Sequence, residues 1–369
     1  MDTRLPIGIV STGSHLPDAV VGNDEIAART GVTAEWIERT TGVRERRRAA
    51  PYEATSDLAA VAAERAIEQA GLAAGQLSCL VVATCTSDHP QPATAAVVGR
   101  LIGARRAVAF DVNATGGGFL CGYAAAERML RGEPAGSYAL VVGADVCSRL
   151  AGPADPRGAA LLGDGAGAVV LGRVPAGQGT LATVLSGCAD GSGAVAEPAP
   201  EDRAPHENAG YLTTAGPGGR AVAVRRLRQA VERALRTSGR RPHEVRHFVP
   251  QQCDGALLDA VWPRLGLDAG YLHLALSRHG NTGSASIPLT LDKVHREGLL
   301  SEDDLVLLCG LGGGGPAGSV LLRWTATRYA RSASGGLASF LRHRLPAPAA
   351  PDRHGPAVPA AGLRAARPA

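Results

Sequence analysis

Short runs of consecutive apolar residues alternate, in the first half of the chain, with longer segments in which apolar residues recur at helical spacing. The longer segments predict helices at 56–70 and 117–131. The short runs predict strands at 7–10, 80–84, 107–112, 138–143 and 166–171. A strand that is apolar along its whole length is buried on both faces, so helices must cover both sides of its sheet. The pattern therefore predicts an α/β fold built in layers.

The second half of the chain repeats this order of elements. Its predicted elements are a strand at 247–250, a helix at 255–265, a strand at 271–276, a turn at 279–282, a further helix and a strand at 304–309. Leu80 and His247 are 167 residues apart, and Tyr138 and Asp304 are 166 apart. This near-constant offset indicates two copies of one unit. We expect the active centre where the corresponding helix N-termini of the two copies meet.

These patterns divide the chain into an N-terminal half at 1–172, a C-terminal half at 173–327 and a tail at 328–369. The tail is rich in Pro, Ala and Arg, and it carries seven arginines against one acidic residue, Asp352. We expect the tail to be disordered; an arginine-bearing docking arm is the alternative. Because the whole chain has a formal charge of +4, the two halves together are slightly acidic.

Composition and charge exclude several classes of function. No basic stripe with interleaved aromatic residues is present, so we expect no nucleic-acid partner. No signal-peptide-like segment and no run of 18 apolar residues occurs, so we expect a cytoplasmic protein with no membrane partner. The seven cysteines form no CxxC pair, and their odd number argues against a disulfide framework. Without clustered histidines or paired carboxylates, we also expect no metal site.

Five motifs occur in an order that resembles β-ketoacyl-ACP synthase III of the thiolase fold. The resemblance extends over about residues 5–324. The motifs are Thr12–Pro17, Glu35–Ile37 with Thr41–Arg46, Gly163–Ala168, Arg278–Thr282 and Gly312–Gly314. The resemblance implies a duplicated five-layer αβαβα architecture and a dimer, either a homodimer or a heterodimer with a homologue.

The resemblance also implies a catalytic Cys, His and Asn, of which this chain keeps one. In that family the cysteine takes the acyl group, and the His and Asn stabilise the enolate that decarboxylation leaves. Gly116 stands at the cysteine position within the segment 110–119, and Gln251 stands at the histidine position. Only Asn281 is retained. A residue without a side chain forms no thioester, and a glutamine amide cannot relay a proton at neutral pH as imidazole does. We therefore expect no decarboxylative condensation by the family's usual route.

The groups that remain are expected to form a site of hydrogen-bond donors that stabilises negative charge. The main-chain N–H of Gly116, at the start of a helix, and that of Gly314 are candidate donors to an oxyanion. The amides of Gln251 and Asn281 are candidate donors to the same carbonyl. Thr115 is expected to border the substrate pocket. The glycine run at 312–315 is alternatively expected to form only a tight turn between strands. Cys253 is expected to pack as a small apolar residue rather than to act as a nucleophile.

The resemblance further implies a tunnel for the carrier of the acyl group. Trp36 and Arg157 match residues that sandwich the adenine of coenzyme A, Asp254 replaces an Asn of the tunnel, and Cys253 lies beside the pantetheine arm. Gln91 matches a residue that closes the partner's acyl pocket; its amide predicts a small or polar acyl group, and an exposed loop residue is the alternative. We expect no tightly bound cofactor. The expected substrate is a thioester of coenzyme A or of an acyl carrier protein.

These observations lead to three hypotheses of function. The first is an acyl-thioester-dependent acyltransferase or condensing enzyme of specialised, polyketide-type metabolism that acts without an acyl-cysteine. The second is a non-catalytic partner subunit of an intact synthase III homologue. The third is a binding or cyclising protein that uses the old tunnel as a cavity.

Overall fold

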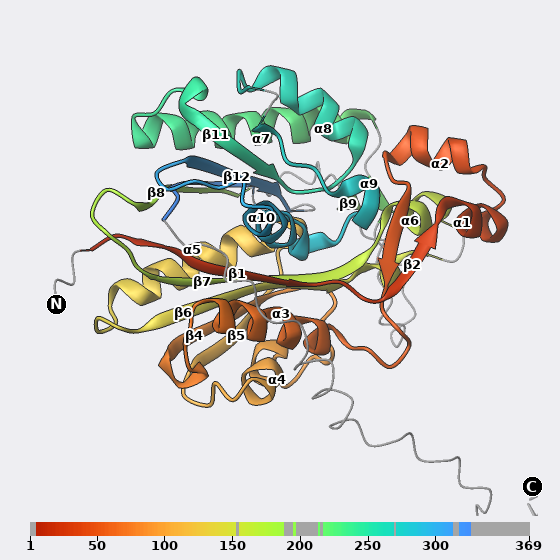
Figure 1. The fold of residues 1–369 in the computed structure, drawn as a ribbon. Helices are drawn as coiled ribbons and strands as arrows, with labels where there is room; N and C mark the ends of the chain where they lie inside the picture. Colours follow the sequence, from red (N-terminus) through yellow and green to blue (C-terminus); the bar gives the residue numbers. More distant parts are fainter. Residues whose placement is uncertain are drawn as a thin grey trace, which may run out of the picture. The chain divides into compact units, whose positions relative to one another are not determined.

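A five-stranded mixed sheet forms the first half of the molecule (Figure 1). The computed structural model describes residues 5–152, 155–187, 195–196, 213–214, 217–268, 271–312 and 317–325, which belong to one compact unit at 1–330. The sheet has the order β1-β7-β6-β4-β5. Its strands are β1 Ile7–His15, β4 Leu77–Ala83, β5 Val108–Val112, β6 Tyr138–Val146 and β7 Asp164–Arg173. β4 is parallel to β5 and β6, while β7 is antiparallel to β1 and β6. All five predicted strands of the first half are therefore confirmed.

A four-stranded sheet with the order β11-β12-β13-β8 forms the second half. Its strands are β8 Gly179–Ser186, β11 Val245–Pro250, β12 Leu305–Leu311 and β13 Ala317–Arg323. β11 is parallel to β12, and the other two pairs are antiparallel. This is the pattern of β4, β6, β7 and β1 repeated. Two short antiparallel pairs lie outside these sheets: β2 Ala19–Gly22 with β3 Glu45–Arg48, and β9 Val195–Ala196 with β10 Thr213–Thr214.

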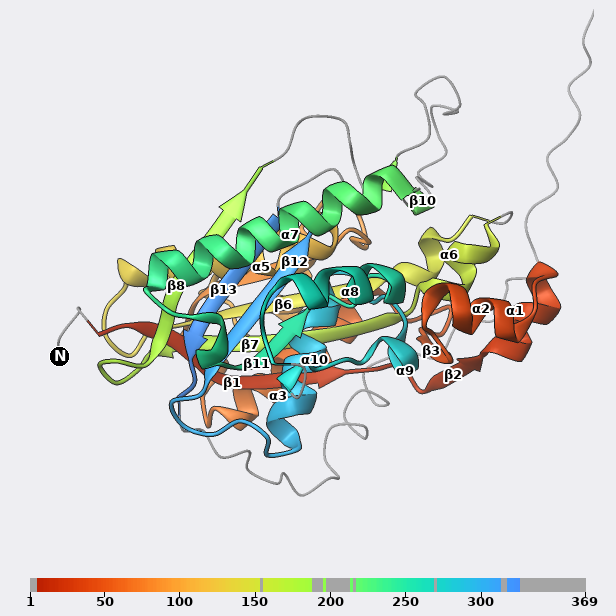
Figure 2. The same ribbon diagram turned by 90° about the horizontal axis from the view of Figure 1, so that it is seen from above.

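Helices cover the sheets in five layers, as the sequence pattern predicts (Figures 1 and 2). The outer layers are α3 Thr55–Gln69 with α4 Thr94–Leu101 on the first sheet, and α7 Pro217–Ser238 with α8 Gly255–Val261 on the second. The central layer is the pair α5 Gly118–Arg131 and α10 Ser286–Arg296. The remaining helices are α1 Asn23–Thr30, α2 Ala34–Thr41, α6 Pro156–Leu161 and α9 Leu276–His279.

Short 3-10 turns precede the two central helices at equivalent places. They are η2 Thr115–Gly117 and η8 Gly283–Ala285, and they contact each other. The backbone passes very close to the first sheet here, because a Cβ built on Gly143 of β6 would overlap the carbonyl oxygen of Ser284. Glycine at position 143 thus permits the N-termini of α5 and α10 to meet. The remaining 3-10 turns are η1 Ala74–Gln76, η3 Cys147–Leu150, η5 Pro242–Glu244 and η6 Trp262–Arg264.

The predicted strand at 271–276 is wrong. Only an isolated bridge between Phe248 and Leu272 forms there. The side chain of Gln252 replaces the missing ladder, because its Oε1 accepts hydrogen bonds from the N–H groups of Ala275 (2.8 Å) and Leu276 (3.1 Å). Its Nε2 donates to the carbonyl oxygen of Pro250 (2.7 Å). One side-chain amide therefore satisfies backbone groups that a neighbouring strand would otherwise pair.

The predicted tail at 328–369 lies outside the described residues, as does most of 188–216. No helix among the residues that the structure does describe is long and apolar enough to cross a membrane.

Replacing Gln252 by Ala is expected to lower the free energy of unfolding by about 3 kcal/mol, because it leaves several buried backbone groups without partners. Gln252 is only 1% exposed. Chemical denaturation followed by circular dichroism measures the change. Gln76→Ala is the matched control, since the side chain of Gln76 also accepts from a backbone N–H, that of Ala73, but at an exposed site. A loss no larger than that of the control would contradict this role.

Candidate active site

Gly116 and Gln251 meet at the contact between the two halves. Gly116 lies in η2, between β5 and α5, and Gln251 directly follows β11. A Cβ built on Gly116 would overlap Nε2 and Cδ of Gln251 and would lie 2.9 Å from its Oε1. The glutamine side chain therefore occupies the volume that a cysteine side chain at position 116 would need. The two departures from the family pattern are thus linked in space.

Gln251 is held firmly in this position. It is 7% exposed, and its main-chain N–H donates to the carbonyl oxygen of Cys309 (2.7 Å). The N–H of Leu311 donates to its Oε1 (2.8 Å). Because an amide oxygen accepts and an amide nitrogen donates, this bond orients the side chain with Nε2 toward Gly116. A hydrogen-bond donor thus stands where the family places a nucleophile.

Asn281 is the third member of this group. Its N–H donates to the carbonyl oxygen of Leu161 (2.8 Å), which fixes the turn after α9 against the end of α6. Its Oδ1 accepts from the N–H of Gly283 (2.9 Å), and its Nδ2 donates to the carbonyl oxygen of Cys253 (3.1 Å). An amide nitrogen carries two hydrogens, so one of them is left for a ligand. Asn281 is thus bonded to the loop after β11 that carries Gln251, and Gln251 in turn packs on Gly116.

Thr115 lies beside this group with a strained backbone. Its φ is +45°, which is unfavourable for a β-branched residue. Its carbonyl oxygen accepts from the hydroxyl of Ser284 (2.8 Å), so the two 3-10 turns are joined directly. The sharp turn that presents residue 116 is therefore retained although that residue has no side chain.

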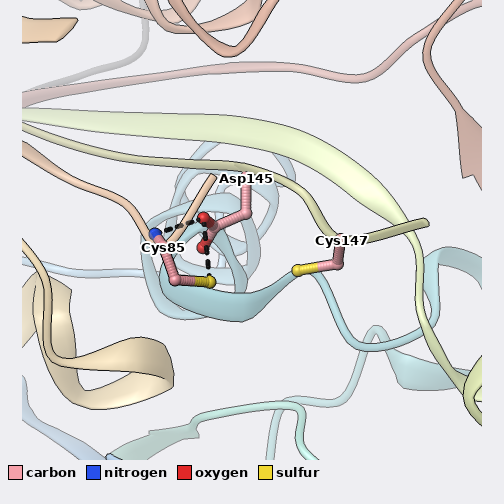
Figure 3. Close-up of side chains that lie close together, drawn as sticks. All are labelled: Cys85, Asp145 and Cys147. Carbon is pink, nitrogen blue, oxygen red and sulfur yellow. Dashed lines mark hydrogen bonds between the residues drawn. The ribbon is translucent and has the colours of Figure 1, made fainter. Parts of the chain in front are cut away.

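A buried carboxylate, Asp145, connects the segments of this region by hydrogen bonds (Figure 3). It lies at the end of β6 and is 0% exposed. One of its oxygens accepts from Ser284 N–H (2.7 Å). The other accepts from the hydroxyls of Thr84 and Thr86 and from both the N–H and the thiol of Cys85. Asp145 thus connects the loop after β4 with the turn that follows Asn281.

Cys85, Asp145 and Cys147 form a cluster that the sequence analysis did not find. Their ligand atoms lie within 4.8 Å of one another, and Figure 3 shows both thiols beside the carboxylate. Cys85 is distant in sequence from the other two residues and lies beside them because β4 and β6 are neighbours. The carboxylate already accepts five hydrogen bonds, so this donor set does not favour a metal ion.

None of the described thiols near the site is activated. The hydrogen bond with Cys85, followed by burial, raises the pKa of Cys147 well above its usual range. The hydrogen bond from Cys147 acts to lower the pKa of Cys85, but burial and the charge of Asp145 outweigh it and raise that pKa. Burial raises the pKa of Cys253 to about 12, and Cys253 lines a small apolar cavity with Phe248 and Trp262. Because the thiolate is the nucleophile, these thiols are poor substitutes for the family's cysteine.

Trp36 and Arg157, which are predicted to border the tunnel, lie on the neighbouring helices α2 and α6. Trp36 of α2 and Ala159 of α6 both pack against a buried apolar cluster that includes Ala160. Arg157, in the first turn of α6, makes an ion pair with Asp254 (Nη2 to Oδ2, 2.6 Å). Two predicted tunnel residues therefore bind each other.

The contacts just described do not include two of the predicted site residues. Gln91 is exposed on the loop before α4, and Gly314 lies outside the described residues.

His279 lies in α9, just before Asn281, and is held neutral. Burial, and to a smaller extent the positive charges of Arg47 and Lys293, lower its pKa from 6.5 to about 4. Its Nδ1 is buried and makes no hydrogen bond to a described residue. Protonation of this histidine would place an unpaired charge beside the turn that carries Asn281.

Comparisons with known proteins agree with this architecture. Family models of 3-oxoacyl-[acyl-carrier-protein (ACP)] synthase III match residues 110–195, and those of its C-terminal part match 235–324. An acetoacetyl-CoA synthase of Streptomyces sp. strain CL190 is 40% identical, over 87% of this chain and 100% of that protein. A β-ketoacyl-[acyl-carrier-protein] synthase III of Symbiobacterium thermophilum is 36% identical, over 86% and 98%.

Solved structures show the same fold. The synthase III of Pseudomonas aeruginosa PAO1 has a TM-score of 0.80 at 35% identity, covering 87% of this chain and 99% of that one. The priming β-ketosynthase of the R1128 polyketide biosynthetic pathway has a TM-score of 0.82 at 28% identity, covering 88% and 98%.

Restoring the cysteine alone is expected to fail. Gly116→Cys forces the side chain of Gln251 out of its place and is expected to lower the free energy of unfolding by about 2 kcal/mol. The double variant Gly116→Cys with Gln251→His is expected to regain at least about 1 kcal/mol of this loss, because the imidazole leaves the thiol its space. Denaturant unfolding of the wild type, both single variants and the double variant gives the coupling energy. Additive effects would show that the two positions do not compete for space.

Acid is expected to destabilise the fold through His279. Because its folded pKa lies below the unfolded value, the unfolded chain binds the extra proton as the pH falls below 6.5. Stability due to this residue is therefore complete above pH 6.5 and is lost toward pH 4, by about 2 kcal/mol between pH 7 and pH 5. Unfolding of His279→Gln at the two pH values should show a correspondingly smaller drop than the wild type. Replacing the exposed His243 by Gln is the control, and equal drops in all three proteins would refute the assignment.

Proposed function

Because the chain belongs to the 3-oxoacyl-[acyl-carrier-protein] synthase III family of acyl-thioester condensing enzymes, we propose that it transfers an acyl group directly from a bound thioester to an acceptor. No acyl-cysteine forms in this reaction. The observation that carries the proposal is the position of the Gln251 amide, which fills the place of the family's thiol. The proposed setting is specialised, polyketide-type metabolism, supported by the structural similarity to the R1128 priming ketosynthase.

The proposed reaction needs donors rather than a nucleophile. The thioester carbonyl accepts hydrogen bonds from the Gln251 amide and from the second hydrogen on Nδ2 of Asn281. An acceptor amine, hydroxyl or carbanion attacks the carbonyl carbon, and the developing oxyanion is stabilised by these amides and by the positive N-terminus of α5. Collapse of the adduct breaks the C–S bond. The sulfur leaves as a thiol with the proton that an amine or hydroxyl acceptor gives up, and as a thiolate when the acceptor is a carbanion.

This site favours some acceptors over others. Neither Gln251 nor Asn281 ionises at neutral pH, so neither of them acts as a general base. An acceptor that is already nucleophilic, such as a free amine or a stabilised carbanion, therefore suits the site better than an alcohol. Most of the rate gain would come from proximity and from the fixed donors.

A non-catalytic partner subunit is the second candidate. It is favoured by the same observation, because a pinned side chain at the former nucleophile position also suits a protein that has lost its chemistry. In that case the intact homologue would catalyse the reaction, and this chain would shape the pocket of that homologue.

The direct-transfer proposal predicts turnover without a covalent intermediate. Incubation with radiolabelled acyl thioesters should release free thiol in the presence of an acceptor amine, while intact-protein mass spectrometry finds no mass increase. Asn281→Asp should lower kcat/KM by about 100-fold, because the carboxylate keeps the bond from Gly283 N–H but loses the donor.

Two outcomes would decide against the proposal. A stable acyl adduct on any cysteine would show that the covalent route persists. Activity found only in a mixed complex with a homologue, and unaffected by Asn281→Asp, would favour the partner subunit. Gln76→Ala is a suitable control, because that side chain is exposed and distant from the site.

A further inference from the structure

The ion pair between Arg157 and Asp254 lies at the outer edge of the site. Asp254 comes three residues after Gln251, and Asn281 bonds the carbonyl oxygens on both sides of the pair, at Leu161 in α6 and at Cys253. Helix α2, which carries Trp36, packs against both α6 and α8 (Figure 2). The pair therefore stands where three helices meet, and Asp254 lies three residues along the chain from Gln251.

The pair is built into the fold and is more than a chance surface contact. The two side chains are 25% and 14% exposed, and the distance from Nη2 to Oδ2 is 2.6 Å. The other oxygen of Asp254 accepts from Leu257 N–H (3.1 Å) and so caps α8. Arg157 itself is held at the first turn of α6, where Asp155 accepts from its N–H (3.0 Å). Both partners therefore have fixed backbones and little freedom to separate.

The charge of Arg157 is consequently neutralised before any ligand arrives. A guanidinium attracts phosphate groups strongly when it has no other partner. Here a phosphate would have to compete with a carboxylate that is already in contact, and it would also be repelled by that carboxylate. An acyl donor that carries no charge at this point would neither have to compete with the carboxylate nor be repelled by it.

We infer that Asp254 is a specificity-determining residue that selects against the nucleotide part of coenzyme A. The favoured donors are acyl thioesters of a pantetheine arm that carries no nucleotide phosphates past Arg157. This inference rests on the proposed use of an acyl thioester and specifies its carrier.

The test compares coenzyme A with pantetheine, which share the thiol arm and differ in the nucleotide with its phosphates. Titration calorimetry with Asp254→Asn should show coenzyme A binding about tenfold more tightly than to the wild type, with pantetheine binding unchanged. The gain should shrink as the salt concentration rises. Asparagine still caps α8, so the fold is expected to be kept.

A matched control separates a local effect from a change of net charge. Glu244→Gln also removes a carboxylate that pairs with an arginine, Arg240, and that accepts from a backbone N–H, that of Arg241. It lies before β11, at the opposite end of that strand from Asp254. The double variant Arg157→Gln with Asp254→Asn should lose the gain, because the freed cation is then absent.

The results distinguish this inference from the proposed function. Equal binding of coenzyme A to the wild type and to Asp254→Asn, or an equal gain in Glu244→Gln, would overturn the inference. Neither result depends on turnover. If the wild type transfers acyl groups but Asp254→Asn does not change the ratio of the affinities for coenzyme A and pantetheine, only the inference fails. If no thioester is turned over while this ratio changes, only the proposed function fails.

Discussion

The volume beside Gly116 is the constraint on which the rest of the site depends. One side chain can fill it, and here that side chain comes from Gln251 across the contact between the two halves. The bond from Leu311 N–H to Oε1 then decides which end of the amide faces the site. The glycine at position 116 and the glutamine at position 251 are therefore structurally coupled, since the amide at 251 uses the space that a thiol at 116 would need.

The frame around this volume is kept by residues that take no part in the chemistry. Asp145 holds the loop after β4 and the turn after Asn281 in fixed positions, and Ser284 bonds the strained Thr115. Strain of this kind costs free energy and persists only where the surroundings enforce it. A site that had become mere packing would not need such a turn, so its retention agrees with a cavity that still orients a ligand.

The fold could be predicted from the sequence because both halves repeat the same order of apolar runs, which sets the layers without knowledge of any contact. The strand at 271–276 could not, since the buried amide of Gln252 satisfies the backbone there in place of a strand. The sequence likewise allowed Gly116, Gln251 and Asn281 to be proposed as site residues by position. It could not predict that Gln251 fills the space beside Gly116, which depends on the side-chain conformation of a residue far away in the chain. The cluster at Cys85 and Cys147 was missed for a similar reason, because only the neighbouring positions of β4 and β6 bring the two thiols together.

The overlap between Gln251 and any side chain at position 116 also sets a direction for evolutionary change. In a lineage that began with cysteine and histidine at these positions, glutamine could enter its present conformation only after the cysteine had become glycine. Once the hydrogen bond from Leu311 held the amide in place, the side chain of Gln251 occupied the volume that a cysteine at position 116 would need. No single substitution then restores the ancestral chemistry in such a lineage. Further changes of function would have to build on the amide donor at position 251.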